Sequence, residues 1–164
     1  MKVELFPFQN KAVTDLRMKV AEALGSYRRM HVPQVVSLQA PTGAGKTLIM
    51  AALVEDIYSG TDQYTEQPEA IFVWLSDSPA LNEQSKQKFD FKADKIRFDQ
   101  CVTIDDESFD MELLEDGHIY FLNTQKLGKA ANLGKHSDTR QFTIWETLEK
   151  NSKRKGRPPL LYYR

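Results

Sequence analysis

The 164-residue chain lacks the features of secreted and membrane proteins. It has one cysteine, Cys101, which excludes an internal disulfide, and its apolar neighbours predict a buried thiol in a reducing compartment, the cytoplasm. No run of about eighteen apolar residues is present, and the N-terminus does not lead from a charged stub into an apolar stretch. These absences argue against membrane spans and secretion signals.

The chain also lacks an excess of either charge, since it has 22 basic and 23 acidic side chains. It therefore has no global basic field of the kind that histone-like or ribosomal proteins use, and any contact with nucleic acid must be local. Its histidines, His31, His118 and His136, are far apart and have no carboxylate or cysteine companions at ligand spacing. Metal-ligand and catalytic-triad roles for them are therefore disfavoured.

What the chain does have is a phosphate-binding loop, APTGAGKT at residues 40–47. The apolar run directly before it, at residues 35–38, predicts a strand, and Lys46 and Thr47 begin the following helix. Glycines allow main-chain amides to wrap an anion, the Lys46 ammonium suits the β- and γ-phosphates, and the Thr47 hydroxyl suits Mg²⁺. The loop therefore predicts binding of ATP and Mg²⁺, with Lys46 and Thr47 as catalytic residues and Thr47 as the metal ligand. The predicted cofactor-binding residues of the loop are Thr42, Gly43, Ala44, Gly45, Lys46 and Thr47.

Helix and strand patterns alternate along the rest of the chain. Apolar residues at three- and four-residue intervals, together with Pro, Gly and Asp at the ends, predict helices. They cover residues 8–24 (ended by Gly25), 46–58 (ended by Gly60), 79–89 and a last helix that Asp138 caps and that ends near residue 150. Short apolar runs predict strands at residues 70–75, 101–104, 118–122 and 160–163. The expected fold class is α/β, a three-layer parallel sheet flanked by helices, with Trp74 and Trp145 in the core.

Hydrolysis needs a carboxylate that helps to hold Mg²⁺ and a second one that orients the attacking water, at the end of a neighbouring strand. Asp105 and Asp77 each follow a predicted strand. Asp77 precedes Ser78 rather than another acid, and Asp105 lies in an acidic stretch that a solvated loop explains equally well. Whether Asp105 is a metal ligand stays open. The basic segment at residues 150–157 suits a phosphate-binding patch, but a solvated loop is the preferred interpretation.

Four segments, in this order, carry a resemblance to a known family. They are FPFQNKAV (residues 6–13), APTGAGKT (40–47), WLSDSPALNEQS (74–85) and FLNTQKL (121–127). In turn they resemble the glutamine motif, the phosphate loop with Ala40 at its first position, motif Ia and the next nucleic-acid motif of superfamily 2 DEAD/DEAH-type helicases. Specifically, the chain resembles the restriction (Res) subunit of type III restriction-modification enzymes, and the resemblance covers essentially the whole chain.

The resemblance implies a P-loop NTPase of RecA-like fold, in which residues 1–164 are the N-terminal portion of the first RecA-like, ATP-binding domain and end before the DEAH box. In this family the glutamine that matches Gln9 reads the adenine edge, because a side-chain amide both donates and accepts. Phe6 and Phe8 either pack on the base or fix the first helix to the core. Hydroxyl and amide side chains of the two later motifs are expected to contact the sugar-phosphate backbone without regard to sequence. These nucleic-acid-binding residues are Ser76, Ser78, Asn82, Gln84, Asn123, Thr124 and Gln125.

The resemblance further implies a parent protein that is a DNA-dependent ATPase, a helicase or translocase, whose partner is DNA. Whether a DNA methyltransferase (modification) subunit is a second partner stays open. Whether an endonuclease domain follows stays open. Because the DEAH box and the second RecA-like domain are not in the sequence, the isolated chain is expected to bind nucleotide without efficient hydrolysis. Two alternatives remain: a small P-loop kinase, which gives Gln9 no task, and a non-catalytic nucleotide-binding module.

Overall fold

The computed structural model describes residues 1–128, 132–154 and 160–163. Helices and strands alternate through most of this part of the chain, which confirms the α/β class. The helices are α1 (Pro7–Met30), α2 (Lys46–Ser59), α3 (Pro79–Lys92) and α4 (Ile144–Ser152). The strands are β1 (Phe72–Ser76), β2 (Cys101–Thr103), β3 (Ile119–Asn123) and β4 (Leu161–Tyr163). Short 3₁₀ helices are η1 (Phe98–Gln100), η2 (Thr124–Leu127) and η3 (Asn132–Gly134).

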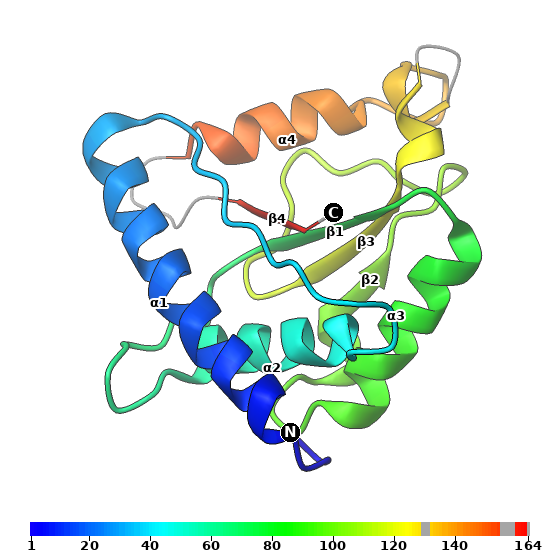
Figure 1. The fold of residues 1–164 in the computed structure, drawn as a ribbon. Helices are drawn as coiled ribbons and strands as arrows, with labels where there is room; N and C mark the ends of the chain where they lie inside the picture. Colours follow the sequence, from blue (N-terminus) through cyan, green and yellow to red (C-terminus); the bar gives the residue numbers. More distant parts are fainter. Residues whose placement is uncertain (129–131, 155–159, 164) are drawn as a thin grey trace.

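The four strands form one parallel sheet in the order β2-β3-β1-β4. Helices α1, α2 and α3 lie on one side of the sheet, and α4 lies on the other (Figure 1). The predicted three-layer arrangement is therefore confirmed. Strands β1 and β3 occupy the centre, with Ser76 at the end of β1 opposite Asn123 at the end of β3.

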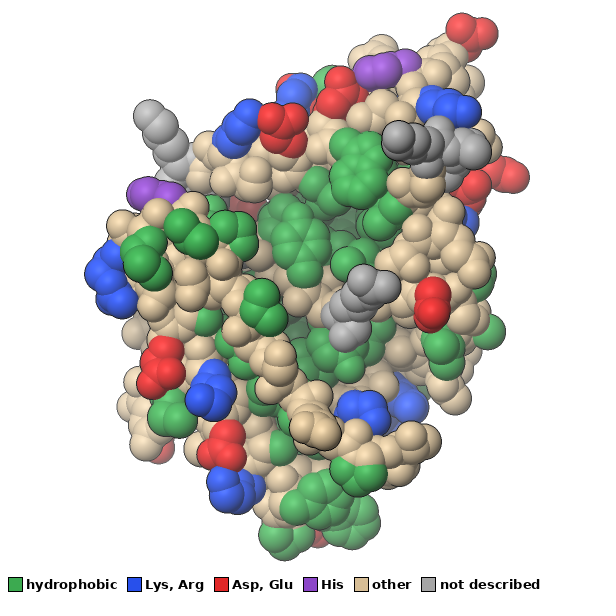
Figure 2. Space-filling view, turned by 45° about the horizontal axis from the view of Figure 1, so that its top comes forward, with side chains coloured by type: hydrophobic (Ala, Val, Ile, Leu, Met, Phe, Trp, Pro, Cys, Tyr) green, Lys and Arg blue, Asp and Glu red, His purple; other side chains and the backbone are tan. Residues whose placement is uncertain are grey.

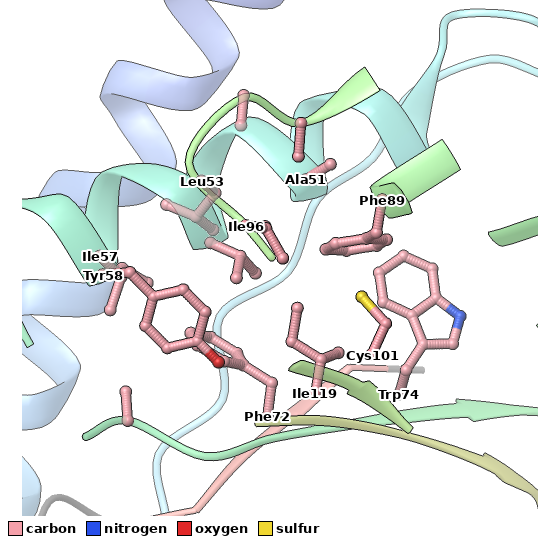
Figure 3. Close-up of a cluster of buried hydrophobic side chains, with 14 of the residues drawn as sticks. Ala51, Leu53, Ile57, Tyr58, Phe72, Trp74, Phe89, Ile96, Cys101 and Ile119 are labelled. Atoms are coloured by element: carbon pink, nitrogen blue, oxygen red, sulfur yellow. The ribbon is translucent and has the colours of Figure 1, made fainter. Parts of the chain in front are cut away.

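The central strands are apolar on both faces because both faces are covered. On the side of α2 and α3, the ring of Phe89 packs edge-on against Trp74 and Phe121, with centroid distances of 5.3 and 5.7 Å (Figure 3). Cys101 is buried in the same cluster, as predicted, and burial raises the pKa of its thiol. On the other side, Val73 packs in a second cluster with residues of β3 and α4.

Helix α4 begins at Ile144, and its cap is Thr143 rather than the predicted Asp138. The Thr143 hydroxyl accepts a hydrogen bond from the Glu146 amide at 3.3 Å, and the Glu146 carboxylate accepts one from the Thr143 amide at 2.8 Å. This reciprocal capping box satisfies main-chain amides at the start of the helix and defines where the helix begins. Ile144 points into the core, whereas Trp145 is 50% exposed, so the prediction of a core position for Trp145 is wrong.

Two predictions for the N-terminal part of the chain are also wrong. Helix α1 continues past Gly25 to Met30 and ends at His31, which has a left-handed φ of 54°; a glycine inside a helix costs only about 1 kcal/mol. Residues 35–38 are extended but form no strand, because they make no backbone hydrogen bonds to a neighbouring strand of the described sheet. This segment crosses from the end of α1 to the start of α2 (Figure 1). None of the described helices is long and apolar enough to cross a membrane.

Candidate nucleotide-binding site

The phosphate loop leads directly into the first turn of α2. Gly43 has φ of 85°, and Gly45, the N-cap of α2, has φ of 78°. These left-handed conformations strain any residue with a side chain. A Cβ atom on Gly43 would meet no atom within 4 Å, so the loop is open to solvent there, whereas one on Gly45 would meet Gln9 Nε2 at 2.6 Å. Gly45 is therefore required both by its φ and by the close approach of Gln9.

Several main-chain amides of the loop are free to bind a ligand. The amides of Gly43, Gly45, Lys46 and Thr47 donate to no acceptor in the described part of the chain, while the Ala44 amide donates to Pro41 O at 3.2 Å. Free amides at the start of a helix lie at the positive end of the helix dipole and point away from the helix. The arrangement suits an anion such as a phosphate group.

The ammonium group of Lys46 lies against the loop itself. Its Nζ donates hydrogen bonds to Ala40 O at 3.0 Å and to Pro41 O at 3.1 Å. Hydrogen bonds between an ammonium and an anion are stronger than those to neutral carbonyl oxygens. An incoming phosphate therefore competes favourably with Ala40 and Pro41 for this group.

Gln9 connects the start of α1 to the phosphate loop. Its side chain is 4% exposed; Oε1 accepts a hydrogen bond from the Phe6 amide at 3.0 Å, and Nε2 donates one to Ala44 O at 2.9 Å. One hydrogen on Nε2 and one lone pair on Oε1 remain beyond these two bonds. Gln9 thus positions the loop.

The rings of Phe6 and Phe8 are stacked on each other beside Gln9, with centroids 6.0 Å apart. They are 65% and 55% exposed. They therefore do not fix α1 to the core, which contradicts one of the two predicted roles. They form an exposed aromatic surface at the start of α1, beside Gln9, which itself bonds to the loop.

The described residues supply one metal-ligand candidate at the loop, the Thr47 hydroxyl in the first turn of α2. Asp105 follows β2, at the opposite edge of the sheet from β4. Its carboxylate accepts hydrogen bonds from the Ser108 hydroxyl at 3.0 Å and the Ser108 amide at 3.2 Å, and these bonds lower the pKa of Asp105. Asp77 is exposed after β1. No group of three or more His, Cys, Asp or Glu residues suited to a metal occurs in residues 1–128, 132–154 and 160–163.

The residues predicted to contact nucleic acid gather where β1 and β3 end. This is the side of the molecule on which α2 begins (Figure 1). The Ser76 hydroxyl donates to Ser78 O at 2.8 Å, and Asn123 Oδ1 accepts from the Gln125 amide at 2.9 Å. Both side chains therefore also serve as turn or cap residues. Thr124 and Gln125 follow in η2.

The two predicted contact residues of α3 differ in exposure. Gln84 is exposed, whereas Asn82 is 3% exposed and its Oδ1 has no partner in the part of the chain that the structure describes. In this conformation Gln84 presents its amide to solvent and Asn82 does not. A role of Asn82 in binding remains a prediction.

Sequence analysis missed two cations that hold the acidic loop after β2. Lys126 Nζ lies 2.5 Å from Asp106 Oδ1, and this bond lowers the pKa of Asp106. Arg140 is buried and donates to the carbonyl oxygens of Phe109 (2.8 Å), Asp106 and Asn132. The partners of these two cations in the acidic loop are 20 to 34 residues away along the chain, so no local pattern in the sequence indicates them.

The described part of the basic segment is held by acidic partners. Lys150 pairs with Glu112 at 2.8 Å, Arg154 pairs with Asp116 at 3.0 Å, and Lys153 pairs with Glu149. Residues 155–157 lie outside the described part. The pairs favour the interpretation as a solvated surface over a phosphate-binding patch.

Comparison with known proteins identifies one family. The family model described as "Type III restriction enzyme, res subunit" matches residues 2–155. The match spans the Gln9 segment, the phosphate loop and the segments at the ends of β1 and β3. Searches of curated proteins and of solved structures gave no match.

Proposed function

Because the chain belongs to the family of type III restriction enzyme res subunits, we propose that it binds ATP and Mg²⁺ as part of a DNA-dependent ATPase, a helicase or translocase. The observation that carries the proposal is the set of free amides at Gly43, Gly45, Lys46 and Thr47, together with the Lys46 ammonium. In this proposal residues 1–164 are the first portion of a RecA-like ATP-binding domain.

The loop residues have distinct tasks in the proposal. The free amides donate to phosphate oxygens, and Lys46 exchanges its bonds to Ala40 and Pro41 for bonds to the β- and γ-phosphates. Thr47 provides a hydroxyl ligand for Mg²⁺, which when bound neutralises charge on the phosphates. We expect the chain by itself to bind nucleotide without efficient hydrolysis, which agrees with the finding that no group of three or more His, Cys, Asp or Glu residues in the described part could hold a metal ion.

Gln9 and the aromatic pair beside it are proposed to recognise adenine. Gln9 is 4% exposed in this conformation, so in the proposal its amide turns toward the base when nucleotide binds; its remaining donor and acceptor then match the adenine edge. The exposed rings of Phe6 and Phe8 offer a surface on which a base can stack. Because Gln9 also bonds to Ala44 O, base recognition and loop position depend on the same side chain.

The ends of β1 and β3 are proposed to contact the DNA backbone. Hydroxyl and amide groups from two neighbouring strands meet there, and small polar groups of this kind hold sugar-phosphate without reading bases. A balanced net charge agrees with such local contacts. The family further leads us to propose a DNA methyltransferase subunit as a partner of the parent protein.

One alternative has support from a specific observation. A non-catalytic nucleotide-binding module agrees with the finding that no group of three or more His, Cys, Asp or Glu residues among the described residues could hold a metal ion. The kinase alternative has none, since the bond between Gln9 and Ala44 gives the upstream helix a role in holding the loop.

The proposal is tested by titrating the chain with a fluorescent ATP analogue and Mg²⁺. Hydrogen bonds to charged groups contribute about 1.5–3 kcal/mol, so Lys46→Ala should weaken binding by about tenfold to a hundredfold. Lys19→Ala removes an exposed lysine from α1 and is the matched control. Equal affinities of the wild type and Lys46→Ala would contradict the proposal.

Steady-state turnover separates the alternatives. We expect little or no ATP hydrolysis by the isolated chain, with or without DNA. If the wild-type chain hydrolyses ATP rapidly and Lys46→Ala does not, then internal acids such as Asp105 suffice for hydrolysis, and the expectation is contradicted. Phosphate transfer to a nucleoside or metabolite would favour a kinase instead.

A further inference from the structure

Trp145 is an exposed aromatic side chain to which the proposed function assigns no role. It lies in the first turn of α4 and is 50% exposed, whereas its neighbour Ile144 is fully buried. Figure 2, in which the top of the molecule is turned forward, shows hydrophobic side chains exposed on the face to which α4 belongs. An exposed indole offers a large flat surface to a ligand.

The position of this indole is fixed by contacts on two sides. The capping box of Thr143 and Glu146 holds the turn that contains Trp145. Glu146 Oε1 also lies 3.3 Å from Nε2 of His136, which follows η3. A Cβ atom placed on Gly134 of η3 would lie 3.5 Å from Nε1 of the indole, so one edge of the ring lies beside η3. A ring held in this way loses little freedom when it binds a ligand.

The short helix η3 connects Trp145 to the proposed DNA contacts. It contacts both η2 and α4, and the same Cβ atom on Gly134 would lie 3.9 Å from the carbonyl oxygen of Gly128, the residue that ends η2. Thr124 and Gln125, which are proposed to contact the sugar-phosphate backbone, lie in η2. In Figure 1, α4 begins beside η2 and η3, where β3 ends. The indole therefore lies on the side of the molecule where the backbone contacts are proposed.

We propose that Trp145 stacks on an unpaired base of a single DNA strand whose backbone is held at η2. The inference rests on the proposed function, because it names a single strand as the DNA that the proposed contacts hold. In a duplex both faces of a base are covered by its neighbours, whereas an unpaired base has a face free for an aromatic ring. Every base has such a face, so the contact ignores sequence, as the backbone contacts do. An uncharged ring also adds affinity for DNA without an excess of basic residues, which the chain lacks.

The test is the binding of a dye-labelled oligothymidine of about ten nucleotides to the chain, measured by fluorescence anisotropy. Loss of one stack between a base and an aromatic ring weakens binding by about fivefold to a hundredfold, and we expect this loss for Trp145→Ala. Trp145→Phe keeps a ring and should bind within about threefold of the wild type. Phe91→Ala, which removes an exposed ring near the end of α3, is the matched control and should not alter binding. Equal affinities of the wild type and Trp145→Ala overturn the inference.

An abasic oligonucleotide and a duplex of the same length separate stacking from backbone contacts. Both keep the phosphates, but neither offers the face of an unpaired base, so the wild type and Trp145→Ala should bind each of them equally. If Trp145→Ala weakens binding to either one as much as to oligothymidine, the inference is overturned and the proposed backbone contacts stand. If the wild type binds none of the three, the proposed DNA contacts fail and the inference fails with them.

Tryptophan fluorescence reports the contact itself. The chain has two tryptophans, and Trp74 is only 5% exposed, so a stacked base should quench the emission of Trp145 and leave that of Trp74 unchanged. We expect unlabelled oligothymidine to quench the wild type but not Trp145→Phe or Trp145→Ala. The emission of buried Trp74 shows that both variants are folded. Binding to the wild type without quenching overturns the inference.

Discussion

The centre of the sheet and the segment before the phosphate loop contain similar apolar residues but differ in structure. Strand β3 lies between two strands and is buried at every position. Residues 35–38 have no strand partner, and Val35 is 89% exposed. The difference shows that an apolar run defines which residues suit a strand, whereas a neighbouring sheet edge determines whether the strand forms.

The largest expected effect comes from shortening the same side chain in the two regions. Val73 in β1 is fully buried, so Val73→Ala should lower the free energy of unfolding by about 2 kcal/mol through lost burial and a new cavity. Val35→Ala should change it by less than about 0.5 kcal/mol. Urea unfolding measures both values, and equal losses would mean that the segment is packed like the sheet.

The two glycines of the loop differ in the space around them. Gly45→Ala should lower the free energy of unfolding by about 1–2 kcal/mol, because it adds a contact with Gln9 to the strain of a left-handed φ. Gly43→Ala, which has the strain but open space around it, should cost about 1 kcal/mol. Thermal or urea unfolding gives the difference. If Gly43→Ala is the more harmful, Gln9 does not hold the loop as described.

A smaller effect is expected from the exposed aromatic rings. Phe8→Ala should weaken binding of the ATP analogue by about twofold to tenfold, since aromatic pairs contribute about 0.5–1.5 kcal/mol beyond area burial. It should leave stability almost unchanged because the ring is exposed. Phe91→Ala, which removes an exposed ring from α3, is the control and should not alter binding. Equal affinities of Phe8→Ala and Phe91→Ala for the analogue would mean that Phe8 does not contribute to nucleotide binding.

Much of the fold could be predicted because its signals are local. The apolar runs of β1 and β3 and the glycine that ends α2 lie in the sequence itself. The cap of α4 also has a local signal, because Thr143 and Glu146 have the spacing of a capping box, although Asp138 is the predicted cap. The absence of a strand at residues 35–38 could not be predicted from a local signal, because strand pairing depends on a distant partner.

The candidate site, like the fold, has some features that the sequence predicts and others that only the folded chain determines. The types of residue proposed to hold phosphate follow from the loop sequence. The bonds of Lys46 to Ala40 and Pro41 and the bond of Gln9 to Ala44 depend on how the chain folds. The burial of Asn82 depends on how α3 packs. Sequence therefore indicates the chemistry of the site, and the structure shows which groups are free to perform it.

The central claim is that the free amides of Gly43, Gly45, Lys46 and Thr47 bind phosphate. It is tested most directly by an experimental structure of the chain with a Mg·ATP analogue. We expect phosphate oxygens at about 2.7–3.2 Å from these amide nitrogens, with Lys46 Nζ moved from Ala40 O to the phosphates. An analogue bound elsewhere, with the four amides still lacking an acceptor, would contradict the account.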